Sequence, residues 1–230
     1  MDIILVAGLW LPSSIWSEVV AELARYQHRA IPVALPGVDD GSAAATLEDQ
    51  VEAVLAAVDA ADRPLVAGHS AASTLAWLAA DRRPEAIRGI ALIGGFPAAD
   101  GDKYADFFPT TDGVMPFPGW EPFEGADSAD LSEAQKEQMA AVTVPVPEGV
   151  SKGVVHLSDP RRYDLPVVLV CPEYTPDQAR AWIDAGELPE LARATRVSFV
   201  DIDSGHWPMV TCPAELARVL DKLTRENLVP

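Results

Sequence analysis

Apolar runs alternate with helical stripes along the first 94 residues. The runs are residues 3–7, 30–35, 64–68 and 88–94, and each is short and almost continuously apolar. Between them, apolar residues recur every three to four positions over residues 15–23, 47–58 and 72–80, as on one face of a helix. A continuous apolar run is typical of a strand covered on both faces. The pattern predicts strands and helices in strict alternation, which favours a parallel sheet with right-handed crossovers.

The alternation stops at Phe96 and resumes near residue 165. Residues 165–171 and 196–202 predict two further strands, and residues 177–185 and 214–224 predict the helices that follow them. The segment from 96 to 162 instead carries many prolines, glycines and aromatics, with one predicted helix at 132–141. A loop-rich insert of this length inside a compact domain is usually functional. We therefore expect one α/β domain over residues 1–230, with a mostly parallel sheet and a lid at about 96–162.

Two local signals refine this scheme. Pro32 lies in the second apolar run and cannot donate a ladder hydrogen bond, so this strand is expected toward a sheet edge. Thr46 is followed three residues later by Asp49, which is the pattern of a capping box at a helix start.

Composition excludes several classes of partner. The chain has 230 residues, 49% of them hydrophobic, and 35 acidic against 17 basic residues give a net charge of -18. Such a surface repels nucleic acid and anionic lipid. Met1, Asp2 and Ile3 lead straight into the first predicted strand, so we expect no positively charged leader, and no apolar stretch is long enough to span a membrane. Cys171 and Cys212 are too few for a disulfide framework or a thiolate zinc site. We expect a cytoplasmic protein that needs no cofactor or metal, and its oligomeric state stays open.

Residues 64–73 carry the first candidate chemistry. They read PLVAGHSAAS, a short strand, a sharp turn with Ser70 at its apex, and a helix. A nucleophile elbow requires small residues two positions either side of the serine, because the turn is tight and strained. Gly68 and Ala72 meet this requirement, although Ala72 departs from the usual glycine. An ordinary strand–turn–helix with a capping serine would give the same short pattern.

A serine nucleophile needs a neighbouring imidazole to accept its proton. The chain has four histidines. His28 lies at the wrong end of its strand, His156 lies in or just after the lid, and the side chain of His69 is expected to point away from that of Ser70. His206 follows the last strand in a glycine-containing loop, at the edge of the sheet where functional groups gather. His206 is therefore the expected general base.

Three stretches together resemble the α/β-hydrolase superfamily. They are GHSAA around Ser70, SGHWP around His206, and the opening VAGLWLPSSIW. The opening loop is similar to that of the plant methylesterase and hydroxynitrile-lyase group, with Ala7 in place of the histidine of its His-Gly pair. The resemblance implies an oxyanion hole formed by the backbone N–H groups of Leu9 and Ala71, the latter directly after the nucleophile.

A catalytic triad adds an acid that orients the histidine. At the position of this acid the chain departs from the family pattern. The family's G-x-x-D pattern after the penultimate strand falls on Pro172 and Thr175, and neither residue matches. Glu173 is the carboxylate nearest the strand end and is long enough to reach the imidazole. Asp177 is expected to begin a helix, and Asp100 and Asp102 follow the preceding strand. Glu173 is the expected acid, with a Ser–His dyad as the alternative.

The sequence therefore predicts a serine hydrolase that cleaves a small ester, lactone or thioester through an acyl-enzyme. Trp10, Trp120, Trp207 and the lid phenylalanines predict a mostly apolar or aromatic pocket for a small-molecule substrate. Two alternatives stay open. One is a hydroxynitrile-lyase-like or other non-hydrolytic enzyme. The resemblance to the hydroxynitrile-lyase group implies a lysine near the site, and the lysines of the chain are Lys103, Lys136, Lys152 and Lys222. The other alternative is a ligand-binding protein that lacks the acid.

Overall fold

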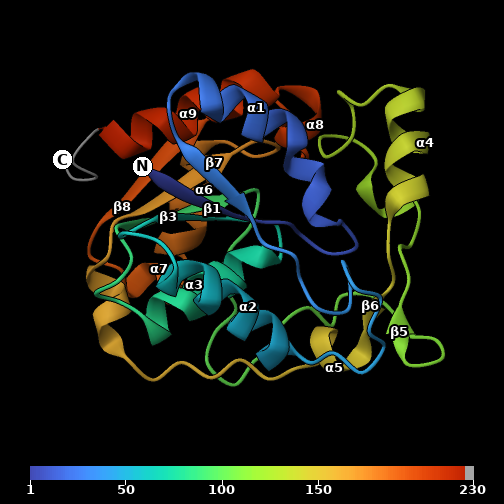
Figure 1. Ribbon diagram of the computed structural model, residues 1–230, viewed down its shortest axis with the longest axis horizontal. Coiled ribbons are helices and arrows are strands. Elements are labelled where there is room, and N and C mark those ends of the chain that lie inside the picture. The colour runs from blue at the N-terminus through green and yellow to red at the C-terminus, as the bar shows by residue number, and fades with distance from the viewer. Residues whose placement is uncertain (226–230) are drawn as a thin grey trace.

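A six-stranded parallel sheet forms the centre of the computed structural model, which describes residues 1–225 (Figure 1). The strand order is β2-β1-β3-β4-β7-β8, and every neighbouring pair is parallel. The strands are β1 (Asp2–Val6), β2 (Arg29–Pro32), β3 (Leu65–His69), β4 (Gly89–Ile93), β7 (Val167–Cys171) and β8 (Val197–Asp201). These are the six apolar runs of the sequence, so the predicted α/β class is confirmed.

The burial of the strands follows their place in the sheet. All five residues of β3, β4 and β7 are buried, as expected for strands covered on both faces. β2 is an edge strand and pairs only with β1, where Pro32 lies opposite Leu5. The edge position expected from Pro32 is therefore confirmed, because proline leaves no ladder donor unpaired at an edge.

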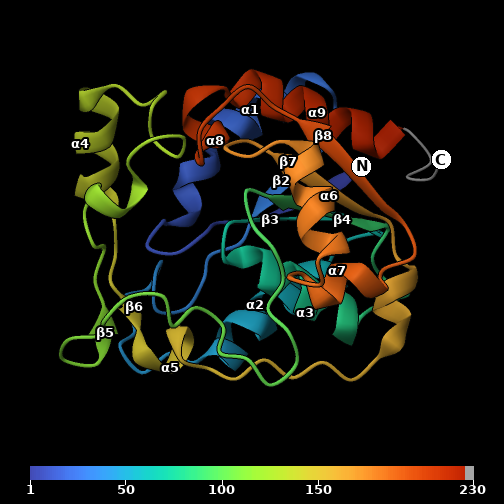
Figure 2. The same ribbon diagram turned by 180° about the vertical axis from the view of Figure 1, so that it is seen from behind.

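Helices cover both faces of the sheet (Figures 1 and 2). One core cluster holds α1 (Ser17–Arg25) and α9 (Pro213–Arg225) against the sheet. The other holds α2 (Leu47–Asp59), α3 (Ala72–Arg82), α6 (Pro176–Asp184) and α7 (Pro189–Arg193). The capping box of Thr46 and Asp49 is present at the start of α2. The short η1 (Ser13–Trp16), α7 and α8 (Pro208–Thr211) were not predicted as separate elements, because four or five residues show no helical period.

The segment from 96 to 162 adds no strand to the six-stranded sheet. Its elements are β5 (Val114–Met115), η2 (Glu121–Phe123), α4 (Glu133–Val142), β6 (Val146–Pro147), α5 (Glu148–Ser151) and η3 (Pro160–Asp164). β5 and β6 form a small antiparallel pair that two-residue strands could not reveal in the sequence. Both ribbon views place α4 at one end of the molecule (Figures 1 and 2). We call this segment the lid.

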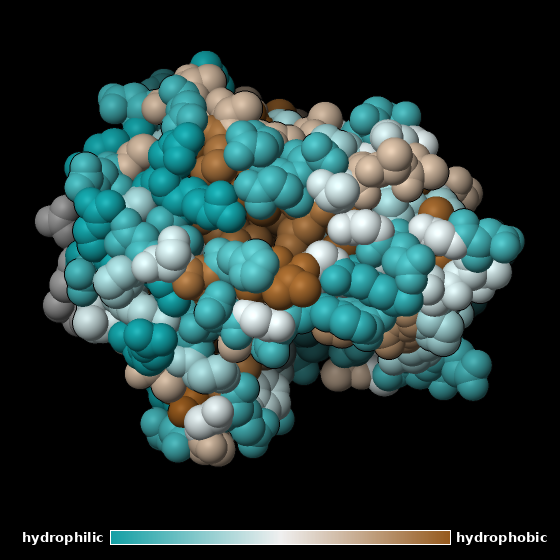
Figure 3. Space-filling view, turned by 90° about the horizontal axis from the view of Figure 1, so that it is seen from below, coloured by the Kyte–Doolittle hydropathy of each residue, from teal (hydrophilic) through white to brown (hydrophobic). Residues whose placement is uncertain are grey.

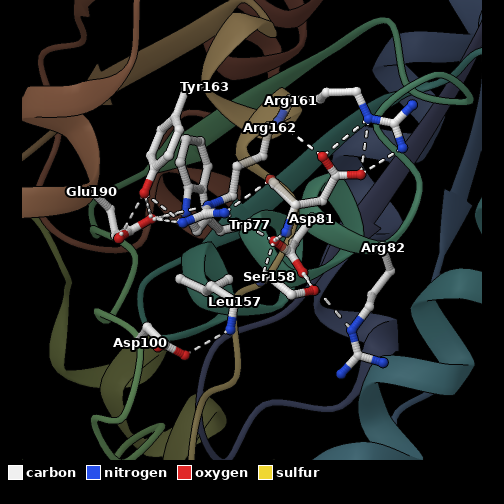
Figure 4. A network of polar contacts seen from close by, with 11 residues as sticks. Trp77, Asp81, Arg82, Asp100, Leu157, Ser158, Arg161, Arg162, Tyr163 and Glu190 are labelled. Atoms are coloured by element: carbon white, nitrogen blue, oxygen red, sulfur yellow. Dashed lines mark hydrogen bonds and ion pairs between the residues drawn. The ribbon is translucent and has the colours of Figure 1, made fainter.

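A buried polar network joins the end of the lid to α3 and α7 (Figure 4). The guanidinium of Arg162 lies between two carboxylates, 3.0 Å from Asp81 and 3.0 Å from Glu190. Glu190 also accepts hydrogen bonds from the indole of Trp77 at 2.8 Å and from the hydroxyl of Tyr163 at 3.1 Å. Because every member is paired, the charges can be buried without an orphaned partner.

Seen from below, the surface of the molecule is mostly hydrophilic, with a hydrophobic hollow near its centre (Figure 3). Within residues 1–225, no helix combines the length and the apolar character needed to cross a bilayer.

Candidate active site

Ser70 stands at the turn between β3 and α3. Its φ is 54°, a left-handed conformation that is strained for a serine. Its N–H donates to Ile93 O at 2.8 Å, which holds the turn against β4. A Cβ at position 68 would lie 2.3 Å from the carbonyl oxygen of Ala72, so only glycine lets the helix start this close to the strand. The sharp turn read from the sequence is present.

His206 and Glu173 meet Ser70 at the carboxyl edge of the sheet. Nε2 of His206 lies 2.9 Å from Oγ of Ser70, and its Nδ1 lies 2.8 Å from Oε1 of Glu173. The three residues follow β3, β8 and β7, strands whose carboxyl ends share one edge. A continuous hydrogen-bonded chain therefore runs from the hydroxyl through the imidazole to the carboxylate.

The other candidate acids are engaged elsewhere. Asp177 pairs with Arg180 at 2.7 Å and its side chain is 93% exposed. Asp100 accepts the N–H of Leu157, and Asp102 accepts the N–H of Ala99. Of the candidates named from the sequence, the structure brings only Glu173 to the imidazole.

Thr175 occupies the position at which the family aspartate was expected. Its side chain accepts the N–H of Gln178 as the N-cap of α6, in a complete capping box. The residue therefore has a structural role at the start of that helix. Glu173 reaches the imidazole from two residues earlier, with the longer side chain.

The side chain of His69, expected to point away from that of Ser70, contacts the loop of His206 and lines the cavity. Its Nε2 lies 2.7 Å from the carbonyl oxygen of His206, and the two ring centroids are 4.9 Å apart. Burial, and then the charge of His206, lower the pKa of His69 to about 3. The neutral ring must donate from Nε2, because a carbonyl can only accept. His69 therefore supports the backbone of His206, and the sequence held no signal for this long-range contact.

The lid also holds the loop that carries His206. The N–H of His206 donates to Asp127 O at 2.8 Å, and the N–H of Gly205 donates to Oδ2 of Asp130 at 2.8 Å. Ser204 Oγ donates to the same carboxylate at 3.2 Å. Partial burial, assisted by the charge of Glu173, raises the pKa of Asp127, while His206 acts in the opposite direction. No pattern in the sequence indicates either aspartate, because both lie more than 70 positions from His206.

Leu9 and Ala71 flank Ser70 with backbone N–H groups. Within residues 1–225, neither group donates to a protein acceptor. Ala71 is the N-cap residue of α3, where the N–H groups at the start of the helix have no helical partner. A Cβ on Gly8 would lie 3.0 Å from Cβ of Ser70, so glycine lets the Leu9 loop pass directly beside the serine. These two donors are therefore available near the hydroxyl.

Trp10 connects that loop to the lid. Its φ is 66°, a strained value for a bulky residue. The lid holds it there, because Trp10 Nε1 donates to Met115 O at 3.1 Å and Trp10 O accepts the N–H of Val144 at 2.8 Å. The ring also packs against Phe117, with centroids 5.5 Å apart.

A small aromatic cavity covers Ser70. Its volume is about 30 Å³, and the aromatic side chains that line it are Trp10, Phe117, Trp120, Phe123 and Trp207. Leu9, Leu11 and Met139 add apolar walls, while Ser70, His69, His206 and Thr143 are its polar members. The apolar and aromatic pocket expected from the sequence is therefore present above the serine.

The lysines that a lyase would require lie away from this cavity. Lys103 pairs with Asp106, Lys136 pairs with Glu133, and Lys152 pairs with Glu148. Among the described residues, no lysine lines the cavity.

The two remaining histidines are outside the site. His28 Nε2 lies 2.9 Å from Asp221, which ties β2 to α9. His156 is exposed in the lid.

A known protein family matches nearly the whole chain. A family model described as the alpha/beta hydrolase family matches residues 3–219. No curated protein sequence matches the chain. Among solved structures, an extracellular α/β-hydrolase from a Paenibacillus species is similar at a TM-score of 0.81 and 18% identity, covering 98% of this chain and 100% of that one.

Two other similar structures carry named activities. A pyrethroid hydrolase from Sphingobium faniae aligns with a TM-score of 0.72 and 18% identity, over 98% of both chains. The methylesterase protein MES16 from Arabidopsis aligns with a TM-score of 0.74 and 12% identity, over 97% of this chain and 98% of that one. At these identities the likeness concerns the fold.

Proposed function

The chain belongs to the alpha/beta hydrolase family, and from this premise we propose that it hydrolyses a small carboxylic ester, lactone or thioester through an acyl-enzyme on Ser70. The observation that carries the proposal is the hydrogen-bonded chain of Ser70, His206 and Glu173 beneath an aromatic cavity. The same geometry is what nucleophilic catalysis by a serine requires.

In the proposed first step, Ser70 attacks the acyl carbon and His206 Nε2 accepts its proton. Nε2 can accept only if Nδ1 carries the ring proton, and Glu173 stabilises this tautomer by accepting from Nδ1. The negative charge of Glu173 then stabilises the imidazolium that forms.

The tetrahedral intermediate places an oxyanion beside the N–H groups of Leu9 and Ala71. One such donor contributes about 3–4 kcal/mol to the transition state in comparable sites. His206 then protonates the leaving alcohol. In the second half of the reaction it activates a water molecule, which releases the acid and restores Ser70.

The cavity favours an uncharged acyl group. Its walls are aromatic and aliphatic, and no carboxylate, lysine or arginine of the described chain lines it. Burying an ion there would leave its charge unpaired, which costs several kcal/mol. The net charge of -18 further disfavours anionic substrates. The names of the pyrethroid hydrolase and the methylesterase agree with ester cleavage.

The structure gives less support to the two alternatives from the sequence. A lyase of the hydroxynitrile type would need a lysine at the site, and the lid lysines are paired elsewhere. The ligand-binding alternative assumed a missing acid, whereas Glu173 contacts the imidazole.

Both cysteines are free, which agrees with the cytoplasmic location that we propose.

A fluorophosphonate probe tests the proposal directly. The wild-type chain should take up one label, which peptide mapping should place on Ser70. Ser70→Ala should remove the label, and His206→Ala should slow labelling and ester hydrolysis by several powers of ten. A label on the neighbouring Ser73, or no label on a folded wild-type chain, would reject the assignment.

A further inference from the structure

The cavity above Ser70 is too small for the ester that the proposed reaction needs. A volume of about 30 Å³ accommodates little more than one or two water molecules. Some wall of the cavity must therefore move when a substrate binds.

A much larger groove lies behind one of these walls. Its volume is about 340 Å³, and it runs between η1 and α1 on one side and α4 and α8 on the other. Its lining is mixed: the apolar members are Pro12, Ile15, Met139, Val142, Met209 and Val210, and the polar members are Ser14, Ser17, Glu18, Gln135 and Gln138. Met139 on α4 lines both the groove and the cavity. Met139 is thus the residue that the cavity and the groove share.

Met139 is well suited to move. It is only 4% exposed, and it lines both the cavity and the groove. Methionine is unbranched and has three rotatable side-chain bonds, so it can change rotamer at low cost. The backbone of α4 is held more firmly, by the capping box of Ser132 and Gln135 at its start and by the bond from Val144 to Trp10 after its end. Rotation of Met139 is therefore an easier opening than displacement of the helix.

We propose that this groove binds the distal end of a linear, uncharged alkyl chain of the ester substrate, which passes Met139 when that side chain swings aside. The inference rests on the ester hydrolysis proposed above and names the substrate class. Val142 presents an apolar side chain to the groove although it is 44% exposed. Glu18 also lines the groove, and its carboxylate disfavours a chain that ends in an anion.

The test compares chain lengths in two series of esters. One series runs from p-nitrophenyl acetate to the octanoate, and the other from ethyl to octyl acetate, because the chain can lie on either side of the carbonyl. The quantity measured is the ratio of kcat/KM for the longest ester to that for the shortest. Each methylene that leaves water contributes about a fourfold factor to this ratio.

Val142→Asp places a charge in the groove and should lower the ratio by about 16-fold or more in at least one series, which corresponds to two or more methylenes. Val154→Asp is the matched control, because Val154 is 46% exposed and lines neither space. It should leave the ratio unchanged. Val142→Thr keeps the shape of valine and should lower the ratio in the same direction if the aspartate variant does not fold.

Substitutions at Met139 test the gate itself. Met139→Ala joins the two spaces and should raise the ratio, whereas Met139→Phe should lower it. An unchanged ratio for folded variants of both Val142 and Met139, in both series, would overturn the inference while ester hydrolysis stands. A folded wild-type chain that cleaves no ester in a Ser70-dependent manner would instead refute the proposed function, and the inference with it.

Discussion

The carboxylate of Asp130 accepts the backbone N–H of Gly205 at 2.8 Å, one residue before His206. The same carboxylate accepts the hydroxyl of Ser204 at 3.2 Å. The lid therefore does more than cover the cavity, because it holds the loop that presents the imidazole to Ser70.

Asp130→Ala should lower kcat by about 10- to 100-fold and leave KM nearly unchanged, because a small displacement of a proton-transfer group slows the chemical step. Asp130→Asn keeps an acceptor oxygen and should recover most of the rate. The rate of fluorophosphonate labelling should fall in parallel with kcat. Glu124→Ala, which removes another exposed lid carboxylate, is the control, and a normal kcat for a folded Asp130→Ala chain would contradict this role.

Glu173→Gln should lower kcat by several powers of ten with little effect on KM. The amide carries no charge to stabilise the imidazolium, and it can hold the ring in the wrong tautomer. Thr175→Ala is the comparison, because Thr175 occupies the expected aspartate position but caps α6. It should cost about 1 kcal/mol in the free energy of unfolding and leave kcat intact. Steady-state kinetics measures kcat and KM of both variants, and urea unfolding measures their free energies of unfolding. Near-normal turnover of Glu173→Gln would place the acid elsewhere.

His69 should make the protein less stable toward acid. Its pKa is about 3 in the folded chain against 6.5 for an unperturbed histidine. Between these values the unfolded chain binds more protons, so the free energy of unfolding falls as the pH drops below 6.5. This residue adds at most about 1.4 kcal/mol per pH unit to that fall.

His69→Gln keeps a donor for the carbonyl of His206 and removes the titration. Urea unfolding at pH 7, 5.5 and 4.5 should therefore show that the free energy of unfolding falls less steeply with decreasing pH in this variant than in the wild type. The carboxylates contribute equally to both proteins, so the difference in slope isolates His69. Equal slopes would show that His69 does not remain neutral in the folded state.

Arg162→Met should lower the free energy of unfolding by about 3–5 kcal/mol, because buried Glu190 loses its ion pair with Arg162 and buried Asp81 is left with the more distant Arg82 at 4.0 Å (Figure 4). The neighbouring Arg161 is the matched control. Its side chain is 58% exposed and pairs with Asp159 and Glu85 at the surface, so Arg161→Met should cost less than about 1 kcal/mol. Urea unfolding at pH 7 measures both, and equal costs would mean that the network contributes no more than a surface pair.

The order of strands and helices, the turn at Ser70 and the candidacy of His206 follow from the sequence alone. Each depends on local causes. An apolar run must be buried. The small Gly68 permits the tight turn at Ser70, and the carboxyl ends of parallel strands meet at one edge of the sheet. Pro32 likewise indicates an edge strand through its missing donor, wherever the rest of the chain lies.

Only the tertiary structure decided which groups surround the imidazole. The choice among Glu173, Asp177, Asp100 and Asp102 depends on distances between strand ends that sequence spacing does not encode. His69 reaches the carbonyl of His206 across 137 positions, and Asp130 reaches Gly205 across 75. The lid has no regular period, so its contacts with the Trp10 and His206 loops arise from how it packs, and the packing of irregular segments is determined by the whole fold rather than by their own sequence.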